Sequence, residues 1–418
     1  MKKLIIIFFI LFNIFSAQSN FDDNVLPKFN IDIINRQKNN NETLLDVFIQ
    51  IPYSNLRFVK NDNIYSSHFN IELVFIDETT NNVLQNISWV EEVKTKNTEQ
   101  TNSVSSFKLS LKKISIPPGT YRIVCNLEDL ESHKVASFDS KFTVRNFNST
   151  LYASDILLIN TDPDYHVKNK LLPNISRIIP YGNKVIKGFY EIYSLTDTTL
   201  NVKYLIQKNN KKILAEIESK LDIKKGKNNF IPVIPDTGLQ LGKYTLKAII
   251  TTLNNKTVAV IRKSFKYVIG DFAIPIDSLD TAIRQMEFIT NADEQEYLLN
   301  APTYSEKVNR FLAFWKSKDP TPETTYNEVL IEYFRRVQFA NNTFTGYKEG
   351  WRSDMGMIYI TLGPPDEVER HPMDGANYPY EVWSYSRINR AFVFIDRTGF
   401  GDYKLQNTNY YDWSKFRM

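Results

Sequence analysis

The chain has 418 residues, so about two to four domains of ordinary size are expected. Its apolar fraction of 42% is sufficient for ordinary globular cores, and its charged fraction of 23% is close to average. The formal net charge of +4 is too small for a surface that binds nucleic acid by charge, so no nucleic-acid partner is expected.

The first residues have the order of a secretory signal peptide. Lys2 and Lys3 form a basic start, an apolar run extends from Leu4 to Phe15, and Ala17-Gln-Ser19 provides small residues for cleavage. The run is shorter than the ~20 apolar residues that span a bilayer, and no later segment is apolar enough for a transmembrane anchor. A buried first helix is the alternative. We predict a leader over residues 1–19 and an exported bacterial protein, either periplasmic or extracellular.

The chain contains one cysteine, Cys125, in a run that has the pattern of a strand. A single cysteine cannot form a disulfide within the chain. An exported protein of this length can be stable without disulfides because its cores are large enough. The sequence therefore predicts a fold that depends on apolar packing.

Residues 20–147 consist of short alternating runs separated by polar loops, as in Phe69-Asn-Ile-Glu-Leu-Val-Phe-Ile. Residues 148–270 have the same character, as in Leu200-Asn-Val-Lys-Tyr-Leu-Ile. Period-two patterning with frequent turns predicts antiparallel strands, with one face in the core and the other in solvent. The expected fold is therefore mainly β over these two segments.

An internal repeat connects the two segments. Gly-x-Tyr leads into a strand at Tyr121 and again at Tyr244, and a phenylalanine follows each tyrosine after 21 residues, at Phe142 and Phe265. This order is common near the end of immunoglobulin-like sandwiches. The spacing predicts two tandem immunoglobulin-like β-sandwiches, although only a few positions match and chance similarity is the alternative.

Neither predicted sandwich has a pattern of metal ligands. His68, His133 and His166 are isolated, without a His-x-His or Cys-containing arrangement. We interpret these histidines as surface or capping residues, and the two sandwiches as spacers or binding modules. No cofactor or metal is predicted.

Beyond residue 270 the apolar period becomes helical. One helix is predicted over residues 278–290, and a second begins at Thr303, where Thr-Tyr-Ser-Glu306 has the capping-box pattern. A third is predicted from Thr321, where proline and glutamate follow. Their apolar stripes are expected to pack in a core.

The end of the chain is expected to form a small antiparallel meander. Residues 357–362 are predicted to be a strand that stops at Gly363-Pro-Pro-Asp366, with Asp366 capping a short turn over residues 367–370. Further strands are predicted over residues 380–385, 391–396 and 403–405. With the helices covering one face, residues 271–418 are predicted to be an α+β domain.

Several motifs occur in order within this last domain. They are Gly350-Trp-x-x-Asp354, Gly363-Pro-Pro-Asp366, Tyr380-Glu-x-Trp383 and Phe394-x-Asp-x-x-Gly-Phe-Gly-Asp402. Together they resemble the GWxTD domain, a family of exported bacterial proteins without an established activity. The resemblance covers residues 273–405. It departs from the naming motif at Ser353, which keeps the hydroxyl of the usual threonine, and it implies no catalytic residues.

Exposed tryptophan and tyrosine beside arginine would form a recognition surface in this domain. The predicted binding residues are Trp351, Arg352, Asp354, Glu381, Trp383, Asp396, Arg397 and Asp402. This surface depends on exposure: if Trp351, Trp383 and Tyr385 are all buried, the aromatic residues belong to the core.

The acidic residues of the block have three possible roles, in turns, in ligand contact or in catalysis. Most lie beside glycine or proline, where aspartate accepts backbone hydrogen bonds. Two carboxylates within ~10 Å would suit glycoside hydrolysis. Residues 396–402 lack the alternating spacing of a calcium loop, and His371 with Asp374 lacks a positioned nucleophile. No catalytic residue is predicted.

The main hypothesis is an exported, non-enzymatic protein whose C-terminal domain binds a protein or glycan of the cell envelope, or serves there as a scaffold. The alternative is an envelope hydrolase that acts on glycan or peptide with carboxylates of the C-terminal domain. It requires at least two of those carboxylates to face one pocket. The sequence does not predict the oligomeric state.

Overall fold

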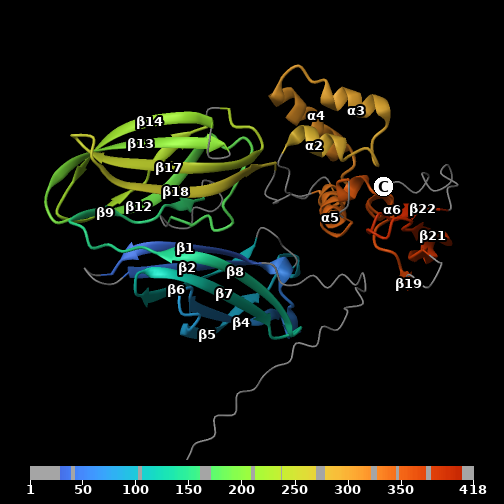
Figure 1. The fold of residues 1–418 in the computed structure, drawn as a ribbon, viewed down its shortest axis with the longest axis horizontal. Helices are drawn as coiled ribbons and strands as arrows, with labels where there is room; N and C mark the ends of the chain where they lie inside the picture. The colour runs from blue at the N-terminus through green and yellow to red at the C-terminus, as the bar shows by residue number, and fades with distance from the viewer. Residues whose placement is uncertain are drawn as a thin grey trace, which may run out of the picture. The chain divides into compact units, whose positions relative to one another are not determined.

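The computed structural model describes residues 29–38, 43–101, 106–160, 171–208, 212–236, 238–269, 278–321, 327–344, 348–372 and 378–406. The predicted leader, His166 and Asp374 lie outside these ranges. The chain divides into two compact units, one of residues 25–332 and a smaller one that contains the residues from Tyr333 onward. The described part of the larger unit contains two β-sandwiches and the helices α1 to α4 (Figure 1).

The first sandwich has two antiparallel sheets. One has the order β1-β2-β6, with strands β1 (Asn30–Gln37), β2 (Thr43–Pro52) and β6 (Phe107–Ile116). The other has the order β3-β4-β7-β8, with β5 also paired to β4, and consists of β3 (Val59–Asn61), β4 (Ile64–Asp77), β5 (Val83–Thr95), β7 (Gly119–Asp129) and β8 (Lys134–Val144). Leu45 and Phe69, one from each sheet, are fully buried in the shared core.

The second sandwich repeats this plan. One sheet contains β9 (Leu151–Ala153), β10 (Leu157–Ile159), β12 (Val185–Ser194), β15 (Gly226–Phe230) and β16 (Val233–Pro235). The other has the order β11-β18-β17-β13-β14, with β11 (Ile178–Pro180), β13 (Thr198–Lys208), β14 (Lys212–Ile223), β17 (Gly242–Thr252) and β18 (Thr257–Val268). β11 pairs with β18 in parallel, and Tyr190 and Leu246 are fully buried between the sheets.

The repeat predicted from Tyr121 and Tyr244 is present: each sandwich has the same tyrosine–phenylalanine pair in a hairpin and the same tyrosine hydrogen bond. Tyr121 lies opposite Phe142 in the β7–β8 hairpin, as Tyr244 lies opposite Phe265 in the β17–β18 hairpin. The Tyr121 hydroxyl donates to the carbonyl of the residue four positions upstream at 3.0 Å, and the Tyr244 hydroxyl does the same at 2.7 Å. This is the tyrosine corner of immunoglobulin-like sandwiches.

β1 departs from the expectation that one face of each strand meets solvent. Ile31 and Ile33 lie in the core of the first sandwich, and the opposite face of β1 is also covered. There Ile34 packs in an apolar cluster with Leu157 and Ile159 of the second sandwich. Figure 1 shows β1 on the side of the first sandwich that faces the second. An alternating strand is therefore buried on both faces because a neighbouring domain covers it.

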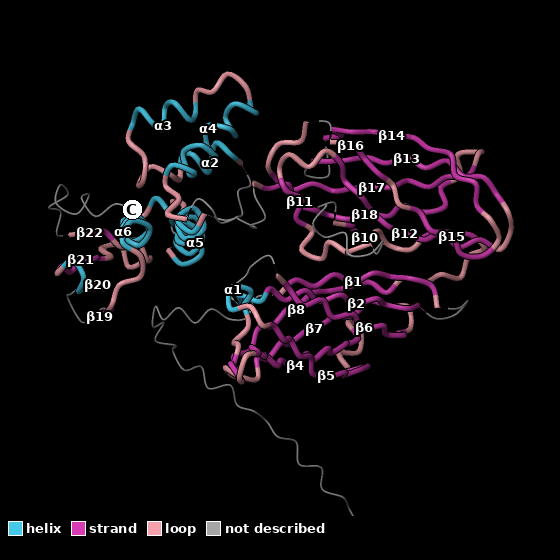
Figure 2. The backbone as a smooth tube through the Cα atoms, turned by 180° about the vertical axis from the view of Figure 1, so that it is seen from behind, coloured by secondary structure: helices cyan, strands magenta, loops and turns pink. Residues whose placement is uncertain are grey.

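The helices follow the second sandwich (Figure 2). They are α2 (Leu279–Arg284), α3 (Ala292–Leu299), α4 (Tyr304–Ser317) and α5 (Glu328–Thr343), while a short α1 (Thr98–Thr101) precedes β6. The Thr303 hydroxyl accepts the Glu306 amide and caps α4, as predicted. The helix expected over residues 278–290 ends at Arg284, and α3 was missed because Leu298 is its one buried residue and no apolar stripe marks it. Part of the predicted start of α5 lies outside the described ranges.

The smaller unit contains most of α5, the short helices η3 (Gly350–Arg352) and η4 (Ser386–Ile388), α6 (Asp354–Leu362) and an antiparallel sheet. The sheet has the order β19-β20-β21-β22, with strands β19 (Glu367–His371), β20 (Tyr380–Tyr385), β21 (Arg390–Ile395) and β22 (Lys404–Leu405). The strands predicted near residues 380, 391 and 403 are confirmed. No helix in the described ranges has the length and apolar character to cross a bilayer.

Two local predictions for this unit are wrong. Residues 357–362, predicted as a strand, form most of α6. This helix is short and buried on nearly all sides, so its sequence has no helical period and its isoleucines mimic strand alternation. Residues 367–370, predicted as a turn, belong to β19. Asp366 does not cap a turn there, because its carboxylate accepts the Ser386 amide at 2.6 Å.

Candidate functional site

The segment around Trp351 is packed closely against α5. A Cβ on Gly350 would lie 1.9 Å from the carbonyl oxygen of Ala340, so only glycine allows the two backbones to approach this closely. The Trp351 backbone amide donates to Asn341 Oδ1 at 3.1 Å, and its indole donates to Glu349 Oε2 at 3.0 Å. Trp351 is 2% exposed, so the ring is a core residue.

Ser353 and Asp354 complete the motif that begins at Gly350; Ser353 caps α6, and Asp354 connects α6 to β22. The Ser353 hydroxyl accepts the Gly356 amide at 2.9 Å, which satisfies one of the free donors at the start of α6. The Asp354 carboxylate accepts the Leu405 amide at 2.9 Å and so connects α6 to β22. The capping role expected of a hydroxyl at position 353 is confirmed. Arg352 remains near the surface, with its guanidinium 4.7 Å from the centre of the Trp351 ring.

The aromatic residues of β20 are also buried. Trp383 is 0% exposed, and its indole donates to Glu381 Oε2 at 3.0 Å. Arg370 donates to the other oxygen of Glu381 at 3.1 Å. The Tyr385 hydroxyl donates to the Gly363 carbonyl, and burial raises the pKa of Tyr385. Since Trp351, Trp383 and Tyr385 are all buried, these three rings belong to the core, and a recognition surface cannot be based on them.

Two other aromatic residues of this block, Tyr378 and Phe400, are exposed, and Phe400 lies at the tip of the loop of residues 396–402, which we call the Phe400 loop. Phe400 is 89% exposed. The loop is organised by Asp396, which is 2% exposed and lies at its base. Asp396 Oδ1 accepts the Thr398 amide, the Thr398 hydroxyl and the Gly399 amide, and Oδ2 accepts the Gly401 amide at 2.6 Å. One buried carboxylate thus receives four hydrogen bonds from the loop.

The electrostatics of Asp396 follow from this geometry. Burial alone would raise its pKa, but the hydrogen bonds from Thr398, Gly401 and Gly399 outweigh burial and lower the pKa. Gly399 has φ 72° and Gly401 has φ 86°, in the left-handed region that glycine adopts without strain. The sequence therefore specifies the loop conformation, and the Asp396 carboxyl that holds it is ionised at neutral pH.

Charged residues surround the loop. Arg397 is exposed and donates to Gln406 Oε1 at 3.0 Å, while Asp402 pairs with Lys404 at 2.8 Å. The predicted residues Asp396, Arg397 and Asp402 therefore lie in one loop, whereas Phe400 itself was not predicted. Its signal was present in the sequence, because an aromatic residue between two glycines has no place in a regular helix or strand.

The GWxTD domain model matches residues 249–417. The match covers less than half of the chain and includes every residue described above for the smaller unit. The resemblance drawn from the sequence motifs is therefore confirmed at the level of the GWxTD domain.

Other comparisons add little. No curated protein matches the sequence. Among solved structures, a red sea bream transglutaminase is 7% identical with a TM-score of 0.19, covering 57% of this chain and 31% of its own. A calcium-binding mutant of Bacteroides uniformis beta-glucuronidase 2 is 10% identical with a TM-score of 0.20, covering 53% and 26%. The chain spans less than a third of either protein.

Four acidic residues of the GWxTD domain are engaged separately. Asp354 binds the backbone of β22, Asp366 binds that of η4, Glu381 binds two side chains and Asp396 binds its own loop. His371 stacks on Tyr380 with ring centres 4.3 Å apart. Within the described ranges no group of three His, Cys, Asp or Glu side chains is placed to hold a metal ion.

Proposed function

We propose that this chain is an exported, non-enzymatic protein of the bacterial cell envelope that binds a protein partner through the Phe400 loop of its GWxTD domain. In this proposal the leader over residues 1–19 directs export, and the two sandwiches carry the domain as a spacer. The partner-binding role is assigned to Phe400 with Arg397 beside it.

The observation that carries the proposal is the construction of the Phe400 loop. Single exposed apolar residues are common on protein surfaces and need no explanation. Phe400 differs because a buried carboxylate holds its loop with four hydrogen bonds, so the backbone that carries the ring has a specified conformation. A pre-organised aromatic residue loses little conformational freedom on binding, and such residues frequently dominate interfaces.

In vivo photo-crosslinking tests this proposal. Phe400 is replaced by a benzoyl-phenylalanine, and intact cells of the source bacterium are irradiated. A discrete adduct with one protein is expected, and it should be lost when Asp396→Ala is added. The matched control places the same crosslinker at Tyr297, an exposed aromatic residue of α3, where no such adduct is expected.

Three outcomes would count against the proposal. They are no adduct from position 400, the same adduct from position 297, and an adduct that does not depend on Asp396. Binding of purified envelope glycan that requires Phe400 would replace the protein partner by a glycan. The hydrolase alternative has less support, because four of its candidate carboxylates are engaged in separate hydrogen bonds.

A further inference from the structure

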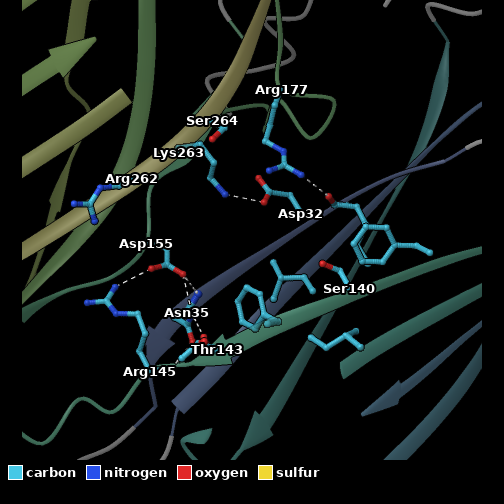
Figure 3. A pocket seen from close by; sticks show the side chains of 15 residues that line it. Asp32, Asn35, Ser140, Thr143, Arg145, Asp155, Arg177, Arg262, Lys263 and Ser264 are labelled. Carbon is cyan, nitrogen blue, oxygen red and sulfur yellow. Dashed lines mark hydrogen bonds and ion pairs between the residues drawn. The ribbon is translucent and has the colours of Figure 1, made fainter. Parts of the chain in front are cut away.

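A cleft of about 450 Å³ lies within the larger unit, where the two sandwiches meet. It is bordered by β1 and β8, which are edge strands of the two sheets of the first sandwich, and by β18 of the second (Figure 3). Pockets that hold small molecules usually measure ~300–1,000 Å³ and occur preferentially between domains. The size and position of the cleft are therefore within the range of known ligand sites.

One wall of the cleft is apolar with a polar interruption. Phe138 and Phe142 on β8 are half-buried, and Ile123 lies beside them on the neighbouring strand. Ser140 lies between the two phenylalanines and shares their face of the strand. This wall offers flat apolar surface together with a hydroxyl group, which is the mixed character that a sugar ring matches.

The carboxylates of the cleft are already paired. Asp32 Oδ1 lies 2.7 Å from Lys263 Nζ, and both side chains are buried. Asp155 pairs with Arg145 at 2.8 Å and accepts the backbone and side-chain N–H groups of Asn35. Figure 3 shows these pairs on two sides of the cleft. Each carboxylate therefore already has one cationic partner, while Asp32 Oδ2 is buried without a hydrogen-bond partner.

Two arginines remain without a carboxylate. Arg177 points into the cleft and donates to the Ile31 carbonyl at 3.4 Å, and Arg262 is exposed on β18. In the part of the chain that the structure describes, neither makes an ion pair. With four cationic side chains against two carboxylates, the cleft lining has an excess of positive charge.

Arg177 is also held in an uncommon backbone conformation. Its φ is 56°, in the left-handed region, which is uncommon for residues other than glycine and asparagine. Its carbonyl accepts the Lys266 amide at 2.8 Å, so the pairing of β11 with β18 fixes this conformation. Strained residues that the surrounding structure maintains cluster at ligand sites.

We propose that this cleft binds an acidic sugar, a hexuronate unit of a short oligosaccharide. Arg177 binds the carboxylate, Arg262 adds positive potential, and the apolar face of the ring lies against Phe138 and Phe142. A bare inorganic anion would leave the apolar wall uncovered, and a neutral sugar would leave Arg177 without a counter-charge. The proposal is independent of the Phe400 loop.

Calorimetric titration of the full chain tests the proposal with digalacturonate as the probe. Saturable binding in the millimolar range or tighter is expected, with neutral cellobiose and inorganic phosphate at least about tenfold weaker. Arg177→Asn removes the guanidinium but tolerates the left-handed φ, so the fold should persist while affinity falls about tenfold. Arg284→Asn, at an exposed arginine of α2 outside the cleft, is the matched control and should bind as the parent does.

Melting curves recorded for each variant separate loss of the site from loss of the fold. If Arg177→Asn unfolds, Arg262→Gln at an exposed position takes its place and should weaken binding about threefold. The proposal is overturned if digalacturonate shows no saturation, or if cellobiose or phosphate binds equally well. It is also overturned if folded variants at both arginines bind like the parent.

Discussion

Lys263 Nζ lies 2.7 Å from Asp32 Oδ1, and both side chains are buried although 231 residues separate them in the chain. The pair joins β18 of the second sandwich to β1, the first strand of the first. On the same face of β1, Arg36 donates to Glu191 at 2.9 Å, and Ile34 fills an apolar cluster between the two sandwiches. The two sandwiches therefore share a buried interface made of ion pairs and apolar contacts.

Removing one partner of this ion pair should destabilise both sandwiches. Asp32→Ala leaves the Lys263 ammonium buried without a partner, which costs about 3–5 kcal/mol. Asp32→Leu with Lys263→Met removes both charges and should recover a large part of that loss. Urea unfolding measures the loss of stability of the chain. Hydrogen exchange in β1 and β18 measures that loss in each sandwich. If the single and double variants lose the same stability, the two charges are not coupled.

The two tyrosine corners should contribute equally. Tyr121→Phe and Tyr244→Phe each remove one hydrogen bond to a carbonyl and keep the ring, so each should cost about 1 kcal/mol in its own sandwich. Tyr53→Phe changes a half-buried tyrosine elsewhere in the first sandwich and serves as the control. Thermal unfolding of the variants provides the comparison. A loss of stability at one corner and none at the other would mean that the two corners share their geometry but not their contribution to stability.

Elements whose stability is local could be predicted from the sequence. The spacing from Tyr121 to Phe142 and from Tyr244 to Phe265 marks matched hairpins because a hairpin is specified by its own turn and pattern. The cap at Thr303 was likewise visible three residues from its partner. These features depend on neighbours in the sequence.

Features that depend on distant parts of the chain could not be predicted. α6 has a strand-like pattern, and it is a helix because Ser353 caps it and surrounding elements bury nearly all of its faces. The alternating pattern of β1 predicts that Asp32 faces solvent, but the second sandwich covers that face of the strand and buries it. In the GWxTD domain, tryptophans suggested a surface, yet both Trp351 and Trp383 satisfy their indoles with a nearby glutamate and are buried.

The naming motif of the GWxTD domain should respond to substitution as a packing device. Gly350→Ala places a Cβ 1.9 Å from a backbone oxygen that cannot move aside, so it should destabilise the smaller unit by about 3 kcal/mol or more. Ser353→Ala removes the α6 cap and should cost about 1 kcal/mol, whereas Ser353→Thr keeps the hydroxyl and should be nearly neutral. Hydrogen exchange of α6 reports all three variants, and a Gly350→Ala protein as stable as the parent would contradict the close packing.

The Phe400 loop should lose its order in acid through Asp396. The pKa of this carboxyl lies below the value of ~4 expected in an unfolded chain, because four hydrogen bonds from the loop favour the ionised form over the effect of burial. Its contribution is therefore fully present above pH ~4 and is lost as pH falls through the lowered folded-state pKa. Hydrogen exchange of the Gly399 and Gly401 amides between pH 6 and pH 2.5 should show protection that falls at the acid end.

Asp396→Asn cannot accept the Gly401 amide with its nitrogen, so protection there should be low throughout and independent of ionisation. Asp366→Asn, which alters a carboxylate that binds η4, is the matched control and should keep the parent profile in the loop. A parent profile that is flat down to pH 2.5, or one that Asp366→Asn abolishes, would show that Asp396 does not organise the loop.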